Sequence, residues 1–280
     1  TLSAEPRLTL SRLGSPLLDF GPAAFQLGIL SEPRDANFDP YRLVVPHPVY
    51  IVPDDLRFLT PESATLGDGS IELVFPEGVT APVAVTYKGD GRFIAQYSSS
   101  DPRVGFMRLI PTIDASEGVY GLGEHFDQVD NRGTVRAMQI EADPDIESLY
   151  NEAHVPVPLA IGTRGWGLFV ESPYPGAFEV ATQSPDNMAV TFGTGQAAAE
   201  GLPVHLFTAA HPLDVTRHYY DITGYPGLPA RWGLGPVVWR DENDDQAQVE
   251  GDLDAIRDLD LATTGYWIDR PYATAVNSFD

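Results

Sequence analysis

The chain has 280 residues, 43% of them hydrophobic, and a formal net charge of −23 at pH 7. This acidic balance argues against nucleic-acid binding and against docking on anionic membranes, because both need a basic surface. It fits a neutral or cationic partner, or an adaptation to salty or extracellular surroundings. The absence of cysteine excludes disulfides, thiolate metal sites and cysteine nucleophiles.

The sequence contains no run of about 18 apolar residues, so no transmembrane helix is predicted. The first ten residues, TLSAEPRLTL, have neither the charged nor the apolar region of a signal peptide, so we expect a leader to be absent or already removed. We expect a periplasmic or extracellular location, with the cytoplasm as the alternative.

Short strands are predicted from residue 1 to about residue 210. Alternating or apolar runs recur there, and turn signals such as Gly67–Ser70 and Lys88–Arg92 separate them. The runs are RLTLSRL, AFQLGIL, SIELVF, VAVTYK, RFIAQYS, VGFMRLI, PVPLAIGT, GWGLFVES, GAFEV and MAVTF. This pattern predicts a mainly β fold in which antiparallel sheets pack as a sandwich.

The pattern changes near His211, where residues 211–224 are typical of a helix that ends at Gly224. The apolar run RWGLGPVVWR (231–240) indicates a strand buried on both faces, as in a parallel sheet. A second helix is expected next, because four apolar residues share one helical face: Val249, Leu253, Ile256 and Leu259. A second apolar strand follows in ATTGYWI.

Strand, helix and strand make one βαβ unit, which cannot cover its own apolar strands. We therefore expect a β-sandwich domain at residues 1–225. Residues 226–280 then open a larger α/β structure that this chain does not complete.

Several motifs favour structural roles. GLGE at Gly121–Glu124 lacks the third glycine and the helix of a dinucleotide site, so we interpret it as a tight corner after a strand. Asp241, Asn243 and Asp245 resemble the opening of an EF-hand loop, but Gln246 stands where that loop needs glycine. The histidines have no zincin spacing. We expect no metal site and no cofactor.

Asp269 is different, because it follows an apolar strand directly. Ligands of parallel α/β structures gather at the carboxyl ends of the strands. Trp239 and Arg240 end the preceding parallel strand, so we expect these three side chains on one rim. The alternative is that Asp269 and Arg270 only form surface ion pairs.

Several segments, in their order along the chain, resemble glycoside hydrolase family 31. They are VYGLGEHFDQVDNRG, EAD at Glu141–Asp143, LYNEAHVPVPLAIGTRGWGLFVES, HYYDITGYPGLPARWGLG, VVWRDENDDQAQV and GYWIDRPY. The resemblance covers about residues 117–280, whereas the first hundred residues match mainly in being β-rich. This family includes α-glucosidases, α-xylosidases and α-transglucosidases.

The resemblance implies a galactose-mutarotase-like β-sandwich followed by the first βαβ unit of a (β/α)8 barrel. It also implies a retaining double displacement on α-linked glucosides or related glycosides, with one aspartate as nucleophile and another as acid/base. No segment here matches the motifs of those aspartates, so we expect no catalytic residue before residue 280. The expected partner is an oligosaccharide or another glycoside.

For this segment the resemblance implies substrate binding. Asp269 matches an aspartate that binds sugar hydroxyls in the −1 subsite. Asp143 matches an aspartate on a sandwich loop that reaches the same pocket, and Asn131 and Arg132 are expected to tie that loop. Arg240, next to Trp239, matches an arginine at the end of the first barrel strand.

Two departures from the family pattern leave the identity of the preferred sugar undetermined. Asp241 stands where many relatives have an aromatic residue, and Arg270 stands where many α-glucosidases have a second acid. An α-transglycosylase, or an enzyme with α-galactosidase or α-xylosidase specificity, therefore remains an alternative. A non-catalytic carbohydrate-binding or structural β-sandwich protein is another, and a complete hydrolase that uses Glu124 with Asp127 or Asp143 is a third.

Overall fold

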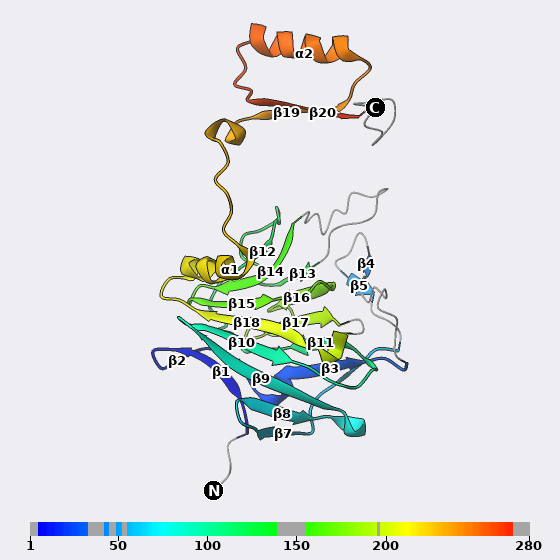
Figure 1. Ribbon diagram of the computed structural model, residues 1–280, viewed down its shortest axis with the longest axis vertical. Helices are drawn as coiled ribbons and strands as arrows, with labels where there is room; N and C mark the ends of the chain where they lie inside the picture. Colours follow the sequence, from blue (N-terminus) through cyan, green and yellow to red (C-terminus); the bar gives the residue numbers. More distant parts are fainter. Residues whose placement is uncertain are drawn as a thin grey trace. The chain divides into compact units, whose positions relative to one another are not determined.

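The computed structural model describes residues 5–32, 42–44, 49–51, 55–138, 155–194 and 197–270 (Figure 1). The chain divides into two compact units, Thr1–Gly224 and Tyr225–Asp280. In the described part of the chain, no helix has the length and apolar character that a membrane span requires.

An eight-stranded antiparallel sheet forms one layer of the larger unit, in the order β12-β14-β15-β18-β10-β9-β8-β7. Its strands are β7 (Ser63–Leu66), β8 (Ser70–Val74), β9 (Thr80–Gly89), β10 (Arg92–Tyr97), β12 (Val119–Gly123), β14 (Pro156–Gly162), β15 (Trp166–Val170) and β18 (Leu202–Thr208). Both predicted hairpin turns are confirmed. Asp90 and Gly91 have positive φ angles, as a two-residue hairpin loop requires.

A six-stranded antiparallel sheet forms the second layer, in the order β13-β16-β17-β11-β3-β6. Its strands are β3 (Phe25–Ile29), β6 (Arg57–Leu59), β11 (Val104–Leu109), β13 (Thr134–Ala137), β16 (Gly176–Val180) and β17 (Met188–Gly193). Two further pairs are β1 (Leu8–Arg12) with β2 (Ser15–Phe20) and β4 (Arg42–Val44) with β5 (Val49–Ile51). Short 3-10 helices are η1 (Pro22–Ala24), η2 (Pro76–Gly78) and η3 (Ala197–Ala199). Each of the ten runs predicted as strands in the sandwich contains a strand in the structure.

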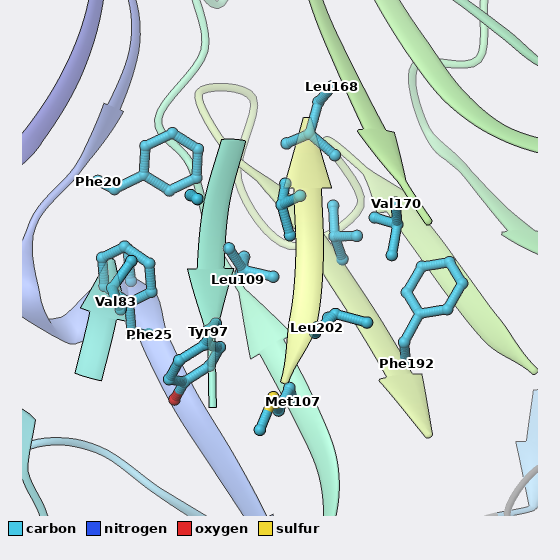
Figure 2. Packing of buried hydrophobic residues seen from close by; sticks show 14 of the residues in the cluster. Phe20, Phe25, Val83, Tyr97, Met107, Leu109, Leu168, Val170, Phe192 and Leu202 are labelled. Atoms are coloured by element: carbon cyan, nitrogen blue, oxygen red, sulfur yellow. The ribbon is translucent and has the colours of Figure 1, made fainter. Parts of the chain in front are cut away.

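The inner faces of the two sheets share one hydrophobic core (Figure 2). Phe25 of the six-stranded sheet meets Tyr97 of the eight-stranded sheet edge to face, with ring centroids 5.6 Å apart. Leu168 on β15 and Phe192 on β17 extend this core and are also buried. The larger unit is therefore a sandwich of antiparallel sheets, as the turn and strand signals predicted.

Helix α1 (Val215–Thr223) follows the 3-10 helix η4 (Pro212–Asp214) and covers part of the outer face of the eight-stranded sheet. Val215 packs there with Phe169 of β15 and Phe207 of β18. The helix ends at Gly224, whose φ of 92° lies in the left-handed region, so the predicted end of this helix is confirmed.

The described residues of the smaller unit include a βαβ motif, made of β19 (Val237–Glu242), α2 (Gln246–Asp258) and β20 (Gly265–Arg270). The two strands pair in parallel. The Oδ1 atom of Asp245 caps α2 by accepting from the Gln248 N–H at 2.9 Å. The (β/α)8 barrel stays a prediction, because many parallel α/β folds contain such a motif.

One expectation for this unit was wrong. The run 231–240 was predicted as a strand, but Arg231–Leu234 forms the 3-10 helix η5 and the strand starts at Val237. Pro236 precedes that strand and has no N–H to donate to a ladder, which explains the late start.

Phe25→Ala should lower the free energy of unfolding of the larger unit by about 3–5 kcal/mol, because it removes a fully buried ring between the sheets. Urea unfolding, followed by the fluorescence of the buried Trp166, measures this loss. Leu66→Ala is the control, since Leu66 is 71% exposed and should cost less than about 0.5 kcal/mol. Equal losses in the two variants would contradict the shared core.

Candidate substrate-binding site

The side chains of β19 and β20 alternate between the two faces of the strand pair. Trp239 lies opposite Trp267 in the register, and Arg240 lies opposite Ile268. Successive residues of a strand point to opposite faces, so Trp239, Trp267 and Asp269 share one face. Arg240 points to the other.

Trp239 and Asp269 are joined directly. The indole Nε1 of Trp239 donates a hydrogen bond to Oδ2 of Asp269 at 3.1 Å. Trp239 is 64% exposed and Trp267 is 62% exposed, so two indoles lie near an oriented carboxylate. Such a carboxylate can accept from hydroxyl groups, and an indole face can cover the apolar side of a sugar ring.

The sequence correctly placed Trp239 beside Asp269 but missed Trp267. Its position two residues before Asp269 was the available signal, because that spacing puts both side chains on the same face of a strand.

Arg240 does not share the face of Asp269, contrary to the expected common rim. Its Nε lies 3.5 Å from Oδ2 of Asp252 on α2, and the same oxygen accepts from the Tyr266 hydroxyl at 2.6 Å. Burial and the hydrogen bond to Asp252 raise the pKa of the Tyr266 phenol. Arg240 points away from Asp269 because side chains alternate along β19, so the neighbours Trp239 and Arg240 point to opposite faces. Arg240 thus links its strand to α2.

The remaining predicted residues are placed in part. Asp241 is two residues after Trp239 and lies on the same face of β19. Arg270 ends β20 opposite Glu242, but its side chain lies outside the described residues, as does all of Asp143. Among the described residues, no three His, Asp or Glu side chains gather closely enough to hold a metal ion.

In the larger unit, Gly121–Glu124 turns the end of β12. Gly121 and Gly123 have φ angles of 91° and 99°. A Cβ atom would lie 2.3 Å from the carbonyl oxygen of Leu159 at the first position, and 2.3 Å from that of Val155 at the second. The glycines therefore allow β12 to approach β14, which confirms their structural role. The turn lies within β12, as a shift in register, rather than after it.

A buried guanidinium braces the loop after β12. Arg136 on β13, 3% exposed in its side chain, donates to both carboxylate oxygens of Asp127, at 3.0 and 2.8 Å. It also donates to Oδ1 of Asn131 at 2.8 Å, and Asn131 donates to the Gly121 carbonyl at 3.2 Å. Burial, the largest single effect, opposes the charge of Asp127. The hydrogen bonds from Arg136 and from the Gln128 N–H, together with the charge of Arg136, outweigh burial and hold the pKa of that carboxyl below its usual range.

This arrangement argues against Glu124 and Asp127 as a catalytic pair, because both oxygens of Asp127 are already bound to Arg136. Arg132 holds the same loop by donating to three backbone carbonyl groups, those of Asp114, Glu117 and Pro185. The expected tie of Asn131 and Arg132 to the loop that presents Asp143 stays a prediction. The loop that carries Asp143 lies outside the described residues.

Residues 79–179, from β9 into β16, match the family model of the glycosyl hydrolase 31 N-terminal galactose mutarotase-like domain. The resemblance that the ordered motifs indicated is thereby confirmed.

Two relatives with assigned activities match parts of this chain. An isomaltosyltransferase from Sporosarcina globispora is 29% identical over 139 residues, which are 48% of this chain and 12% of that protein. The α-xylosidase XylQ from Lactiplantibacillus pentosus is 24% identical over 181 residues, which are 61% of this chain and 22% of that protein. The chain thus spans less than a quarter of the length of either relative.

Solved structures of family 31 share the fold. A sulfoquinovosidase from E. rectale, in complex with an aza-sugar inhibitor, matches with a TM-score of 0.62 at 14% identity. The match covers 95% of this chain and 40% of the sulfoquinovosidase chain. A cycloalternan-degrading enzyme from Trueperella pyogenes, in complex with cycloalternan, has a TM-score of 0.54 at 20% identity and covers 70% of this chain and 30% of its own. Identities this low show a common fold alone.

Asp127→Ala should lower the free energy of unfolding by about 1–3 kcal/mol, because it leaves the buried guanidinium of Arg136 without its carboxylate partner. Urea unfolding at pH 7 measures the loss. Asp68→Ala, at an exposed turn, is the matched control and should have little effect.

The pH dependence of stability gives a second check on this pair. A lowered folded-state pKa contributes stability above the unfolded value of about 3.9, and that stability is lost as the pH falls through the folded-state pKa. The wild-type chain should therefore lose stability more steeply than Asp127→Ala below about pH 4. Identical acid profiles for the two proteins would show that the pair contributes nothing.

Proposed function

We propose that this chain is the N-terminal part of a retaining α-glycoside hydrolase that acts on α-linked glucosides or related glycosides. In this proposal the chain supplies residues of the −1 subsite. The hydrogen bond between Trp239 and Asp269, in a chain with the family 31 N-terminal domain, is the observation that carries it. Asp269 lies towards the carboxyl end of β20, and α/β proteins bind ligands at the carboxyl ends of parallel strands.

Asp269 is the central binding residue of the proposed subsite. Its Oδ2 is held by the Trp239 indole, so the carboxylate is oriented before a sugar arrives. Hydrogen bonds to a charged group contribute about 1.5–3 kcal/mol each, which is enough to fix one ring. Trp267 exposes its indole on the same face and suits the apolar side of that ring.

Four further residues support this pocket in different ways. Asp143, from the segment before β14, and Asp241 add carboxylates that accept from hydroxyls. Arg270 adds a cation at the end of β20, which suits a substituent or an acceptor sugar. Arg240 acts indirectly, because its ion pair with Asp252 holds β19 against α2.

Retaining hydrolysis needs two carboxyl groups about 5–5.5 Å apart. One attacks the anomeric carbon while the other protonates the leaving oxygen and later takes a proton from water. We assign both to residues beyond 280, in a (β/α)8 barrel that starts near residue 226 after a sandwich domain at 1–225. The acidic composition fits a neutral glycoside in the periplasm or outside the cell.

Glycosyl transfer is the second candidate. The isomaltosyltransferase from Sporosarcina globispora has the highest identity of the two relatives described above, and it transfers a glycosyl group by its name. A sugar hydroxyl instead of water would then attack the glycosyl-enzyme intermediate, with the same two carboxyl groups. The first half of the reaction and the role of Asp269 would be unchanged.

In the longer protein, Asp269→Asn should lower kcat/KM for an aryl α-glycoside by about 100-fold, because it weakens charge-assisted hydrogen bonds to sugar hydroxyls. Steady-state kinetics across a panel of aryl α-glycosides measures the loss and identifies the sugar. Asp254→Asn is the control, since Asp254 lies exposed on α2 in an ion pair with Arg257. An unchanged kcat/KM would remove Asp269 from the site, and an inverted anomeric product would refute the retaining mechanism.

The 280-residue chain alone should not hydrolyse any aryl α-glycoside, because the proposed catalytic pair lies outside it. Release of the aryl group, followed by absorbance, checks this. Turnover that survives purification and disappears in Glu124→Gln would instead support a complete hydrolase within these residues.

A further inference from the structure

A pair of hollows lies at the end of the sandwich where β15 ends and β18 begins. The Glu171 N–H donates to the Pro203 carbonyl there, at 3.0 Å. The deeper hollow has a volume of about 310 Å³, and its wall includes Gln96, Glu171, Tyr174, Glu200 and Pro203. A shallower one of about 640 Å³ shares Glu171, Pro173 and Pro203 and continues to Tyr219 of α1. Small-molecule sites have volumes of about 300–1,000 Å³.

Glu171 is held in place by a buried histidine. The Nε2 atom of His205, on β18, lies 2.8 Å from Oε2 of Glu171. The side chain of His205 is 8% exposed, whereas that of Glu171 is 56% exposed. The imidazole stacks on Phe169 at a centroid distance of 5.4 Å and lies 6.2 Å from the Phe207 ring. The packed rings fix the imidazole, and the imidazole orients a carboxylate that faces both hollows.

The lining of the hollows selects the ligand by charge. No described residue in either wall is basic, while Glu171 and Glu200 both carry carboxylates, so phosphorylated and sulfonated ligands are disfavoured. The carboxylates and the Gln96 amide can pair with hydroxyl groups. Pro158, Pro173, Pro203 and Tyr219 supply apolar surface. A neutral sugar ring presents hydroxyl groups and an apolar face together.

We infer that these two hollows form an accessory binding site for a neutral α-linked oligosaccharide, with Glu171 as its central acceptor. The choice of sugar rests on the proposed function, whereas the site itself lies wholly within the larger unit. The site is at the end of the sheet where β14 begins, since Leu159 of β14 pairs with Phe169 of β15. In this inference the site holds sugar units other than the one that reacts, and it raises affinity for long chains by tethering.

Isothermal titration calorimetry of the 280-residue chain with isomaltotriose tests this site. We expect a dissociation constant on the order of 1 mM, a value typical of weak small-ligand binding. Glu171→Ala should weaken binding at least about tenfold, and Glu171→Gln should weaken it less, because the amide oxygen still accepts hydrogen bonds. Glu72→Ala, an exposed glutamate on β8 of the same sheet, is the matched control and should leave the constant unchanged.

One further measurement tests the charge selectivity of this site. Glucose 6-phosphate, which is anionic, should bind more weakly than glucose, because no described residue in either wall is basic. No heat at about 20 mM isomaltotriose, equal constants for wild type and Glu171→Ala, or tighter binding of glucose 6-phosphate than of glucose would overturn the inference.

The longer protein separates this inference from the proposed function. There, Glu171→Ala should raise KM for a long oligosaccharide and leave kcat/KM for an aryl α-glycoside unchanged. If the longer protein cleaves and transfers nothing but its Glu171-dependent binding persists, the proposed function fails and the accessory site stands. An equal loss of kcat/KM on the short and long substrates would overturn the accessory site instead.

Discussion

The edge-to-face contact between Phe25 and Tyr97 joins two sheets that share no strand. Around it, apolar side chains from both layers form one buried cluster, so the strands of each sheet are fixed relative to those of the other. The same packing fixes the ends of the strands, and it thereby fixes the points from which the connecting loops start. The brace of Arg136 and the carboxylate of Glu171 both depend on this packing, because their partners come from different strands or loops.

A different constraint governs the smaller unit, where alternation along two parallel strands decides which side chains can act together. Trp239 and Asp269 meet because they share a face, and Arg240 faces α2 although it is the neighbour of Trp239. Large apolar side chains such as Val237 and Trp267 are exposed in this unit. The single helix of a βαβ motif covers one face of its strand pair, which explains why Trp239 and Trp267 on the other face are exposed among the described residues.

The sequence predicted the elements well because their signals are local. Alternating runs bounded by Gly and Asp turns identified the strands of the sandwich, and a helical period identified α2. The sequence did not predict the side-chain contacts that depend on which strands pair and in which register. The pair of Glu171 and His205 spans 34 residues and exists only because β15 lies beside β18. Arg240 was misplaced because the strand end was treated as one location, when its two faces are separate.

The carboxylates described here fall into two classes, according to the side chain that binds each of them. Asp127 and Asp101 are bound by the guanidinium groups of Arg136 and Arg103, which lower the pKa of each carboxyl and use its hydrogen-bonding capacity within the fold. Asp269 is instead held through one oxygen by an indole N–H, and Glu171 through one oxygen by a histidine. A carboxylate oriented through one oxygen keeps the other for a ligand.

That distinction also explains how an acidic chain could recognise neutral sugars. A guanidinium that binds both oxygens of a carboxylate, as Arg136 binds Asp127, competes with a ligand for them, whereas an indole or imidazole orients one oxygen and adds a ring beside it. Asp269 and Glu171 have this arrangement in two separate units, on different secondary structure. The same arrangement at two places suits a hydroxyl-rich ligand, because each carboxylate can accept from hydroxyl groups while a ring lies beside it.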